Sequence, residues 1–535
     1  MKKTLLAYCL LLTAYCFSQP KLVVGIVVDQ MRYDYIDRYW NKFSNDGFKR
    51  LVNEGYNCKN TNYNYVPTFT GPGHASIYTG ATPSANGIVS NQWTNRENRK
   101  EIYCAEDNSV ATIGSTSVAG QMSPKNLLSS TIGEELRKES KNKSKVIGIA
   151  LKDRGAILPA GHNATAAYWY DGTNGNWITS TYYMKEMPQW VNDFNKKELA
   201  KKYLSQAWTT ILPVEQYTES DSDDNLCEQP FKGKEKPAFP YDLPTLMKQN
   251  GELGLIRSTP FGNSLTKEFA METIRNENMG KETVSDFFSV SFSSTDYIGH
   301  QFGPQSVEAE DCYIRLDKDI SEFLKFLDEW LGKDNVLVFL TADHGGGECV
   351  PCLQKKNIQA GVVDEKTVAD SLKKFFAKTY NDSLLISVSD FDVYLDREKI
   401  NKKNLSVPNV SYKAAKYLLT MNGISEALTA TTIDGDNFHD SIHNKVKAGF
   451  YPDRCGDIIF VLKEHWLEGF HKGTSHGSPY LYDTHVPLLW WGYNVKHGSS
   501  NETLTITQIA PTVSKLLNIP KPNGCTSKPI SSLVK

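Results

Sequence analysis

Three segments of the chain share a pattern in which an apolar, β-branched run ends in an aspartate or an aspartate–histidine pair. They are Lys21 to Asp29, Ser289 to Asp296 and Asn335 to His344. Runs that are apolar on both faces are typical of buried parallel strands covered by helices on each side. In open sheets of this kind, ligands bind at the carboxyl ends of the strands. The pattern therefore predicts a functional site at that edge of a sheet.

Other segments extend this to an α/β fold with a mainly parallel central sheet and helices on both faces. Lys145 to Leu151 and Val486 to Gly492 have the character of further strands, and amphipathic helical patterns lie between the strands. Two stretches differ from these segments in composition. About 171–262 is rich in Trp, Tyr, Pro and charge, and about 360–450 contains lysine-rich helical segments. We expect both to be inserted cap segments over the site.

The first 18 residues have the pattern of a secretory signal peptide. Lys2 and Lys3 precede an apolar stretch from about Leu5 to Phe17, which is too short to span a bilayer comfortably. Cleavage near Ser18 would leave a mature chain without a transmembrane segment. We therefore expect the protein to be exported, to the periplasm or the medium.

Eight cysteines remain after this segment is removed. An even count in an exported chain favours disulfides, although their connectivity cannot be deduced from sequence. Cys349 and Cys352 have the spacing of a redox or zinc motif, but no second close pair follows, so we expect them to form structural disulfides. The eight are Cys58, Cys104, Cys227, Cys312, Cys349, Cys352, Cys455 and Cys525.

The charge composition limits the class of partner. The 535 residues include 59 basic and 61 acidic side chains, for a formal charge of −2 at pH 7. This balance offers no global basic field for nucleic acid or anionic membrane. We expect no specific nucleic-acid partner, and any bound anion must be held by local charges.

Six aspartates and histidines provide two plausible sets of three metal ligands. Mixed imidazole and carboxylate donors with open positions suit catalytic zinc, and manganese or iron would accept the same donors. Two such ions about 4 Å apart stabilise both the attacking and the leaving oxygen of an in-line phosphoryl displacement. The six residues are Asp29, Asp296, His300, Asp343, His344 and His476.

Thr70 is the candidate nucleophile. It precedes Gly71, Pro72 and Gly73 and a helical-looking run, so its hydroxyl would lie at a helix N-terminus. Backbone N–H groups and the helix dipole favour an alkoxide and a bound anion there, and a coordinating zinc ion would lower the pKa of the hydroxyl further. The alternative is that Thr70 is only a helix cap.

The order of these motifs resembles the alkaline phosphatase superfamily. Asp29 is followed by TGPGH, TDYIGH, TADHG and TSHG, and the resemblance spans nearly the whole mature chain. It implies two zinc ions per chain and Thr70 as a metal-bound nucleophile. The first zinc would be held by Asp296, His300 and His476, and the second by Asp29, Asp343 and His344.

Other branches of this superfamily fit the motifs less well. Sulfatases carry a C/S-x-P-x-R pattern, whereas Thr70 cannot become formylglycine and His74 occupies the arginine position. Magnesium-dependent alkaline phosphatases use a Ser nucleophile and a third metal ion. No third acidic set is evident in this sequence, so a third metal is not predicted.

Lys152 and Arg154 favour the monoesterase interpretation over the diesterase interpretation. A phosphate monoester carries two negative charges and is bound more favourably by additional cations beside the metals. A diester carries only one negative charge. The two residues end the Lys145 to Leu151 strand and could point into the site together. They resemble the pair of the PafA-like, phosphate-irrepressible bacterial alkaline phosphatases, in which the arginine grips phosphate and the lysine supports a transition-state oxygen. Asn91 matches a phosphate-binding asparagine that diesterases share.

The remaining histidines have simpler explanations. We expect His74 to pack under the nucleophile helix. His439 and His443, with Asp440 between them, are expected on a solvated surface. His471 and His485 lie near His476 in sequence, and we prefer His476 because SHG matches the family-like loop.

The sequence thus predicts an exported, zinc-dependent alkaline phosphatase that hydrolyses small phosphate monoesters through a phosphothreonine intermediate. Because the proposed ligands run from Asp29 to His476, we expect one catalytic domain over 19–535, acting as a monomer. A nucleotide pyrophosphatase or phosphodiesterase on the same scaffold is the alternative enzyme. From a different class, an exported binding protein with an inactive fold of this type stays open.

Overall fold

The structure is a computed structural model that describes residues 19–435, 441–469 and 471–534. The segment assigned to a signal peptide lies outside the described residues, as do His439 and Asp440. Within these ranges, no helix is long and apolar enough to cross a membrane.

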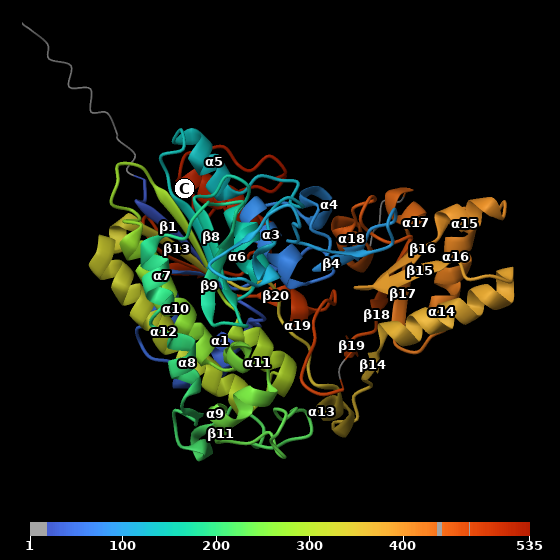
Figure 1. The fold of residues 1–535 in the computed structure, drawn as a ribbon, viewed down its shortest axis with the longest axis horizontal. Coiled ribbons are helices and arrows are strands. Elements are labelled where there is room, and N and C mark those ends of the chain that lie inside the picture. The colour runs from blue at the N-terminus through green and yellow to red at the C-terminus, as the bar shows by residue number, and fades with distance from the viewer. Residues whose placement is uncertain (1–18, 436–440, 470, 535) are drawn as a thin grey trace, which may run out of the picture.

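A ten-stranded sheet forms the centre of the fold (Figure 1). Five neighbouring strands in its middle, in the order β13–β1–β12–β7–β8, run parallel. Every residue of these five strands is buried, as expected for parallel strands covered on both faces. Their bounds are Val336–Thr341, Leu22–Val28, Asp286–Phe292, Val146–Ala150 and Ala166–Asp171. The predicted α/β architecture is confirmed.

Further strands extend the sheet at both ends, and antiparallel pairs join them to the parallel strands. On one side β21 (Leu488–Gly492) pairs with β13, and β2 (Tyr56–Cys58) and β22 (Gly498–Ser500) follow. On the other side β9 (Asn176–Ser180) pairs with β8, and β6 (Thr112–Ile113) pairs with β9 as the edge strand. The carboxyl ends of the parallel strands therefore lie in the middle of a wide sheet.

Two predicted strands differ in extent from the observed ones. The run from Ser289 to Asp296 is shifted, because β12 ends at Phe292 and Asp296 lies in the first turn of helix α11 (Ser294–Phe302). The run from Val486 is divided at Pro487, which lacks the N–H that a central strand would use.

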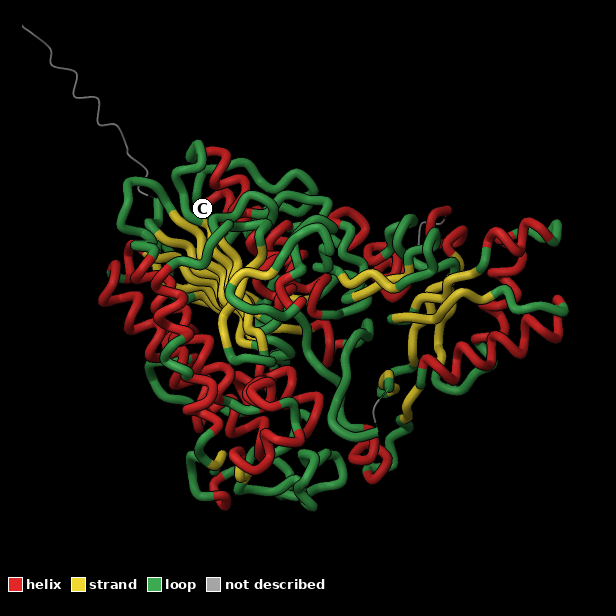
Figure 2. Tube along the Cα trace, viewed as in Figure 1, coloured by secondary structure: helices red, strands yellow, loops and turns green. Residues whose placement is uncertain are grey.

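Helices cover both faces of the sheet, as Figure 2 shows. On one face α10 (Phe261–Asn276) contacts β12 and β7 and packs against α12 (Val307–Leu331). On the other face α6 (Asp153–Ala160) contacts β7 and β8 and packs against α3 (Thr70–Thr79), with α5 (Ile132–Glu139) beside them. Helix α3, which begins at the candidate nucleophile, is thus held within the fold.

The stretch at about 360–450 forms most of a lobe at one side of the molecule (Figure 1). Its four-stranded sheet has the order β15–β16–β18–β17 and an apolar cluster of its own with helices α14 and α16. The lobe extends past residue 450, because β18 belongs to it. The bounds are Leu385–Ser389, Asp392–Leu395, Ile458–Leu462 and Ile424–Thr429 for the strands, and Glu365–Tyr380 and Val407–Leu418 for the helices.

The stretch at about 171–262 consists mainly of short elements. Helices α7 (Gln189–Asn195) and α8 (Leu199–Leu204) pack near β9 and α10. A two-stranded ladder of β10 (Ala207–Trp208) and β11 (Tyr241–Asp242) follows. This segment lies on the α10 side of the sheet, away from the lobe (Figure 1).

The even cysteine count does not correspond to four disulfides. Among the described residues, five cysteines have no disulfide bond, and all five are buried. They lie on separate elements and pack as small apolar side chains, for example Cys58 in β2 and Cys312 in α12. The other three of these five are Cys104, Cys455 and Cys525.

Candidate functional site

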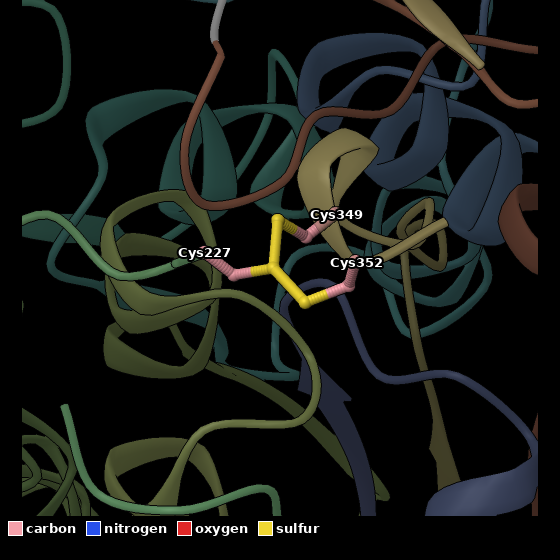
Figure 3. A group of neighbouring side chains, drawn as sticks. All are labelled: Cys227, Cys349 and Cys352. Atoms are coloured by element: carbon pink, nitrogen blue, oxygen red, sulfur yellow. A yellow bond between two sulfur atoms is a disulfide. The ribbon is translucent and has the colours of Figure 1, made fainter. Parts of the chain in front are cut away.

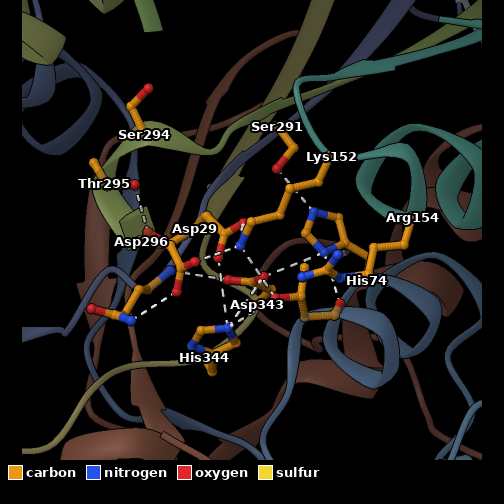
Figure 4. Close-up of polar contacts among 12 residues, drawn as sticks. Asp29, His74, Lys152, Arg154, Ser291, Ser294, Thr295, Asp296, Asp343 and His344 are labelled. Carbon is orange, nitrogen blue, oxygen red and sulfur yellow. Dashed lines mark hydrogen bonds and ion pairs between the residues drawn. The ribbon is translucent and has the colours of Figure 1, made fainter. Parts of the chain in front are cut away.

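The carboxyl edge of the parallel strands gathers polar side chains from four neighbouring strands (Figure 4). Asp29 follows β1, Asp343 and His344 follow β13, and Lys152 follows β7. Asp296 comes from α11, directly after β12. Because β13, β1, β12 and β7 are consecutive in the sheet, residues from distant parts of the sequence meet at one place.

One group of possible metal ligands consists of Asp29, Asp343 and His344, whose donor atoms lie within 4.8 Å of one another. His344 Nε2 is 3.6 Å from Asp29 Oδ1 and 3.5 Å from Asp343 Oδ2. Both of these carboxylate oxygens are buried and have no hydrogen-bond partner among the described residues. Buried carboxylate oxygens left in this state, beside an imidazole nitrogen, fit a divalent cation.

A second group consists of Asp296, His344 and His476, again with donor atoms within 4.8 Å. His300 lies beside this group, with Nε2 3.1 Å from Asp296 Oδ1. The rings of His344 and His476 stack with centroids 3.5 Å apart. The structure therefore brings all six predicted ligands together, but it places His344 between the two sets instead of in the second alone.

Each of the three imidazoles is oriented by a backbone carbonyl. In every case Nδ1 bonds to a main-chain oxygen, so Nε2 is the nitrogen that faces the carboxylates. Such partners fix the tautomer and the ring plane of histidine ligands. The pairs are His300 with Thr474, His344 with Gly345 and His476 with Thr68, at 2.8, 2.9 and 2.8 Å.

Burial shifts the protonation of this cluster. It raises the pKa of Asp29, and raises that of Asp343 well above its usual range. Burial also lowers the pKa of His344 to about 3, which keeps its imidazole neutral and its lone pair available. Burial alone would raise the pKa of Asp296, but the charges of His300 and Lys152 outweigh it and hold that pKa well below its usual range.

Lys152 carries a positive charge into the cluster. Its Nζ lies 2.7 Å from Asp29 Oδ2 and 2.6 Å from Asp296 Oδ2, and the side chain is 3% exposed. Burial by itself would lower the pKa of Lys152, but Asp29 and Asp296 raise it above its usual value. Three buried carboxylates, including Asp343, face this one ammonium, so further cations would be needed to balance them.

Thr70 lies at the first position of α3, after Phe69 as an extended N-cap residue. Its hydroxyl is buried, 3.4 Å from Lys152 Nζ and 3.4 Å from His344 Nε2. Thr70 is not the N-cap residue of α3, and its hydroxyl contacts His344 and Lys152 instead. The hydroxyl therefore faces the ligand cluster, which favours the nucleophile interpretation over the cap interpretation.

Two glycines let α3 approach the site closely. A Cβ on Gly73 would lie 2.3 Å from the carbonyl oxygen of Asp343, so a larger residue there would displace the helix or the ligand segment. Gly71 N donates to Asn91 Oδ1 over 2.8 Å. This bond places the Asn91 amide at the helix N-terminus, beside Thr70.

Arg154 has different hydrogen-bond partners from Lys152. It lies within the first turn of α6, half-buried, and its Nη1 is 3.0 Å from the hydroxyl of Tyr103. Tyr103 in turn donates to the Asp153 carboxylate. Figure 4 shows Arg154 beside His74, at the α3 side of the cluster. Lys152 thus enters the acidic cluster, and Arg154 stands at its margin.

Sequence reasoning missed Gln30. Its backbone N–H donates to Asp343 Oδ1 over 3.1 Å and its side-chain amide donates to Asp296 Oδ1 over 2.7 Å, so it joins the two ligand groups. The residue has a φ of 61°, a conformation that few non-glycine residues adopt. Only its position after Asp29 could have drawn attention to it.

The other histidines behave largely as expected. His74 is a fully buried residue of α3, bonded to the Thr70 carbonyl through Nδ1 and to Ser291 Oγ through Nε2, both at 2.9 Å. His485 stacks on Tyr33 away from the cluster. His443 pairs with Glu426, and His471 is exposed. Neither belongs to a group of possible metal ligands among the described residues.

Comparison with known proteins gives matches over nearly the whole chain. The model of the type I phosphodiesterase / nucleotide pyrophosphatase family matches residues 23–486. Alkaline phosphatase PafA of Elizabethkingia meningoseptica is 42% identical, covering 96% of this chain and 95% of that protein. Alkaline phosphatase PhoV of Synechococcus elongatus is also 42% identical, covering 97% and 94%. A protein of Myroides odoratus named calcium-transporting ATPase is 43% identical, covering 97% and 95%.

The solved structures agree with these matches. The crystal structure of wild-type alkaline phosphatase PafA superposes with a TM-score of 0.94 at 41% identity, covering 97% of this chain and 99% of that one. Human ectonucleotide pyrophosphatase / phosphodiesterase 5 superposes with a TM-score of 0.52 at 14% identity, a likeness of fold alone.

Proposed function

The chain belongs to the type I phosphodiesterase / nucleotide pyrophosphatase family and, within it, to the group of the alkaline phosphatases PafA and PhoV; on that premise, we propose that it is an alkaline phosphatase that hydrolyses phosphate monoesters. The position of the Thr70 hydroxyl is the main structural support for this proposal. The buried Thr70 hydroxyl lies 3.4 Å from both Lys152 Nζ and His344 Nε2, at the point where a helix N-terminus meets the carboxylate cluster.

Two divalent cations fit the ligand cluster, and zinc suits its imidazole and carboxylate donors. The proposal assigns Asp29, Asp343 and His344 to one ion and Asp296, His300 and His476 to the other, with the hydroxyl of Thr70 at the margin of both. When bound, such ions supply Lewis-acid stabilisation of the oxygens that gain charge during phosphoryl transfer.

The chain's own groups supply binding and the nucleophile. Thr70 Oγ attacks phosphorus in line, the P–O bond to the leaving alcohol breaks, and that alcohol departs with a proton. Water then attacks the phosphothreonine, which releases inorganic phosphate and restores the hydroxyl. The N-terminus of α3 and the Asn91 amide lie beside Thr70, where they would offset the charge of the transferring oxygens.

Lys152 and Arg154 give this site its preference for monoesters. A monoester presents one more negative charge than a diester, and each cation near the non-bridging oxygens favours the more highly charged substrate. Lys152 Nζ lies 3.4 Å from Thr70 Oγ1, so it can reach a phosphoryl oxygen of a phosphate held at that atom. Arg154 lies beside the same helix end. The diesterase alternative requires that these cations contribute equally to both substrates.

The experiment for this proposal is an assay of purified protein with an aryl phosphate at alkaline pH, before and after treatment with EDTA. We expect hydrolysis that is lost with the chelator and restored by added zinc, because three buried carboxylates and the neutral imidazole of His344 are available as ligands. A rate that EDTA leaves unchanged, in protein shown to contain no tightly bound metal, would contradict the proposal.

The cellular location also forms part of the proposal. The pattern of residues 1–18 supports export with removal of this segment, to the periplasm or the medium. We also propose a monomer with a single catalytic domain, because the ligands of one site run from Asp29 to His476. Sequencing the N-terminus of protein recovered from outside the inner membrane tests the cleavage. An intact Met1 on that protein would contradict it.

A further inference from the structure

Three cysteine sulfurs meet in one place (Figure 3). They form a group that shares no residue with the two Asp/His groups. Cys349 directly precedes helix α13 (Val350–Lys355), Cys352 lies in that helix, and Cys227 comes from the 171–262 stretch. The Cα–Cα distance from Cys227 is 5.8 Å to Cys349 and 6.5 Å to Cys352. Both separations are within the range that a disulfide spans.

Only one of the two bonds to Cys227 can exist at a time, because a sulfur atom forms a single disulfide. Cys349 and Cys352 are three residues apart at the start of a helix, so their side chains share one face and reach the same partner. In either state one thiol of the three is left over. We propose that Cys227, Cys349 and Cys352 form a thiol–disulfide exchange site, which consists of one disulfide and one exchanging thiol.

The exchange step is balanced within the cluster. The thiolate of Cys352 attacks Sγ of Cys227 in the Cys227–Cys349 disulfide. The bond between Cys227 and Cys352 forms as the bond to Cys349 breaks, and the proton released by Cys352 passes through solvent to the Cys349 thiolate. No oxidant or reductant is consumed, as in other exchange reactions of this type.

The accessibility of the three residues determines what the site can bind. Cys227 and Cys349 are 4% and 3% exposed, whereas Cys352 is only partly buried. When Cys227 is paired with Cys349, the remaining thiol is therefore the accessible one. It can take a small disulfide, R–S–S–R, forming a mixed disulfide with one R–S group and releasing the other as a thiolate.

The site lies between segments that support the metal ligands. The Cys227 carbonyl accepts from Gly473 N over 2.5 Å, and Gln229 N donates to Gln301 O over 2.9 Å. These bonds hold the loop before His476 and the helix end after His300. Cys349 and Cys352 follow the loop that leaves His344, so the disulfide joins the supports of the two ligand groups.

The linkage itself is tested by peptide mapping of the full-length protein, which does not depend on the phosphatase assignment. Free thiols are trapped with N-ethylmaleimide at low pH before digestion with trypsin, without reduction. We expect peptide 203–232 linked to peptide 334–355, with one label that fragment ions locate on Cys349 in some molecules and on Cys352 in others. A label confined to one of them, a Cys349–Cys352 disulfide, or three labelled thiols would overturn the proposal.

Two single variants check the exchange independently. Cys349→Ser and Cys352→Ser should each retain a disulfide from Cys227 to the remaining cysteine and lose the uptake of a small disulfide such as cystamine. Wild-type protein should take up about one equivalent, detected as a mass increase of the intact chain. Failure of either variant to form its disulfide would contradict the alternation.

A metal-thiolate site is the other chemistry that three cysteines permit, and metal content distinguishes it. We expect Cys227→Ser to hold as many zinc ions as wild type at saturation, but to lose them to a chelator about tenfold faster, in the range seen for residues that support metal ligands. Cys525→Ser, a buried cysteine with no disulfide, is the matched control. Loss of one zinc equivalent in Cys227→Ser would overturn the exchange site. Since the chelator result also rests on the proposed function, the peptide map is the decisive test.

Discussion

The ammonium nitrogen of Lys152 lies 2.6 Å from Oδ2 of Asp296, and both side chains are less than 5% exposed. The same nitrogen is 3.4 Å from the Thr70 hydroxyl oxygen. A single buried cation is thus within reach of a metal-ligand carboxylate and of the nucleophile. Its removal should affect the balance of charge in the cluster as well as the chemistry.

Lys152→Ala should lower kcat/KM for an aryl phosphate monoester by about 100-fold or more, the scale of losing one preorganised charged group at a reacting oxygen. The variant leaves Asp29 and Asp296 without their ammonium partner, so we expect its thermal midpoint to depend more strongly on added zinc. Lys145→Ala, a partly exposed lysine before the same strand, serves as the control. Wild-type kinetics in Lys152→Ala would remove this residue from the mechanism.

Thr70→Ala should lose activity by a factor of about 10⁴ or more, as expected for a nucleophile. Because Phe69 and not Thr70 is the N-cap residue of α3, the variant should fold and bind metal as wild type does. Thr70→Ser keeps a hydroxyl at the helix end and should retain substantial turnover. Near wild-type turnover in Thr70→Ala would show that another group attacks phosphorus.

Tyr103→Phe tests the support of Arg154. The tyrosine hydroxyl lies between the Asp153 carboxylate and Arg154 Nη1, so it positions the guanidinium without being expected to touch substrate. We expect KM for the monoester to rise roughly 3- to 10-fold, the cost of one lost hydrogen bond, with kcat nearly unchanged. Equal effects on kcat, or none on either constant, would argue against a positioning role.

Stability of the lobe should fall as pH rises through the neutral range. Burial raises the pKa of Asp392 from 3.8 to about 8, and that of Asp390 to about 7. A carboxyl group whose pKa is raised on folding contributes stability that is complete below about pH 4 and is lost as pH approaches the folded value. The thermal unfolding midpoint should therefore be lower at pH 9 than at pH 5.

Asp392→Asn tests this directly, because an amide of the same shape stays neutral at every pH. The stability of the variant relative to wild type should increase between pH 5 and pH 9, by roughly 2 kcal/mol or more. Asp364→Asn, at an exposed helix cap of the same lobe, is the control and should show no such gain. A gain at pH 9 that Asp364→Asn reproduces would mean that burial of Asp392 is not the cause.

The sequence was sufficient to locate the core of the site. Asp29 and Asp343 follow continuous apolar runs, and such runs identify buried parallel strands whose carboxyl ends must converge. The sequence pattern puts Asp296 at the end of a strand, but the strand ends at Phe292 and the residue lies in the first turn of α11. Both positions put it at the same edge, so the error in secondary structure did not alter the site.

Other features could not be predicted because they depend on three-dimensional neighbours. Gln30 joins the two ligand groups through an unusual backbone conformation that no motif marks. The role of Tyr103 depends on a contact across 51 residues to Arg154. Cysteine parity suggested several disulfides, but pairing requires proximity, and among the described residues only Cys227, Cys349 and Cys352 meet.

The most direct test of the central claim is the ratio of kcat/KM for 4-nitrophenyl phosphate to that for its methyl ester, with zinc added. A site built around Lys152 and Arg154 predicts a ratio of about 100 or more in wild type, because each cation should contribute about tenfold or more to binding the additional charge. The ratio should approach unity in the variant that combines Lys152→Ala and Arg154→Ala. A wild-type ratio at or below one would contradict the account and identify a phosphodiesterase.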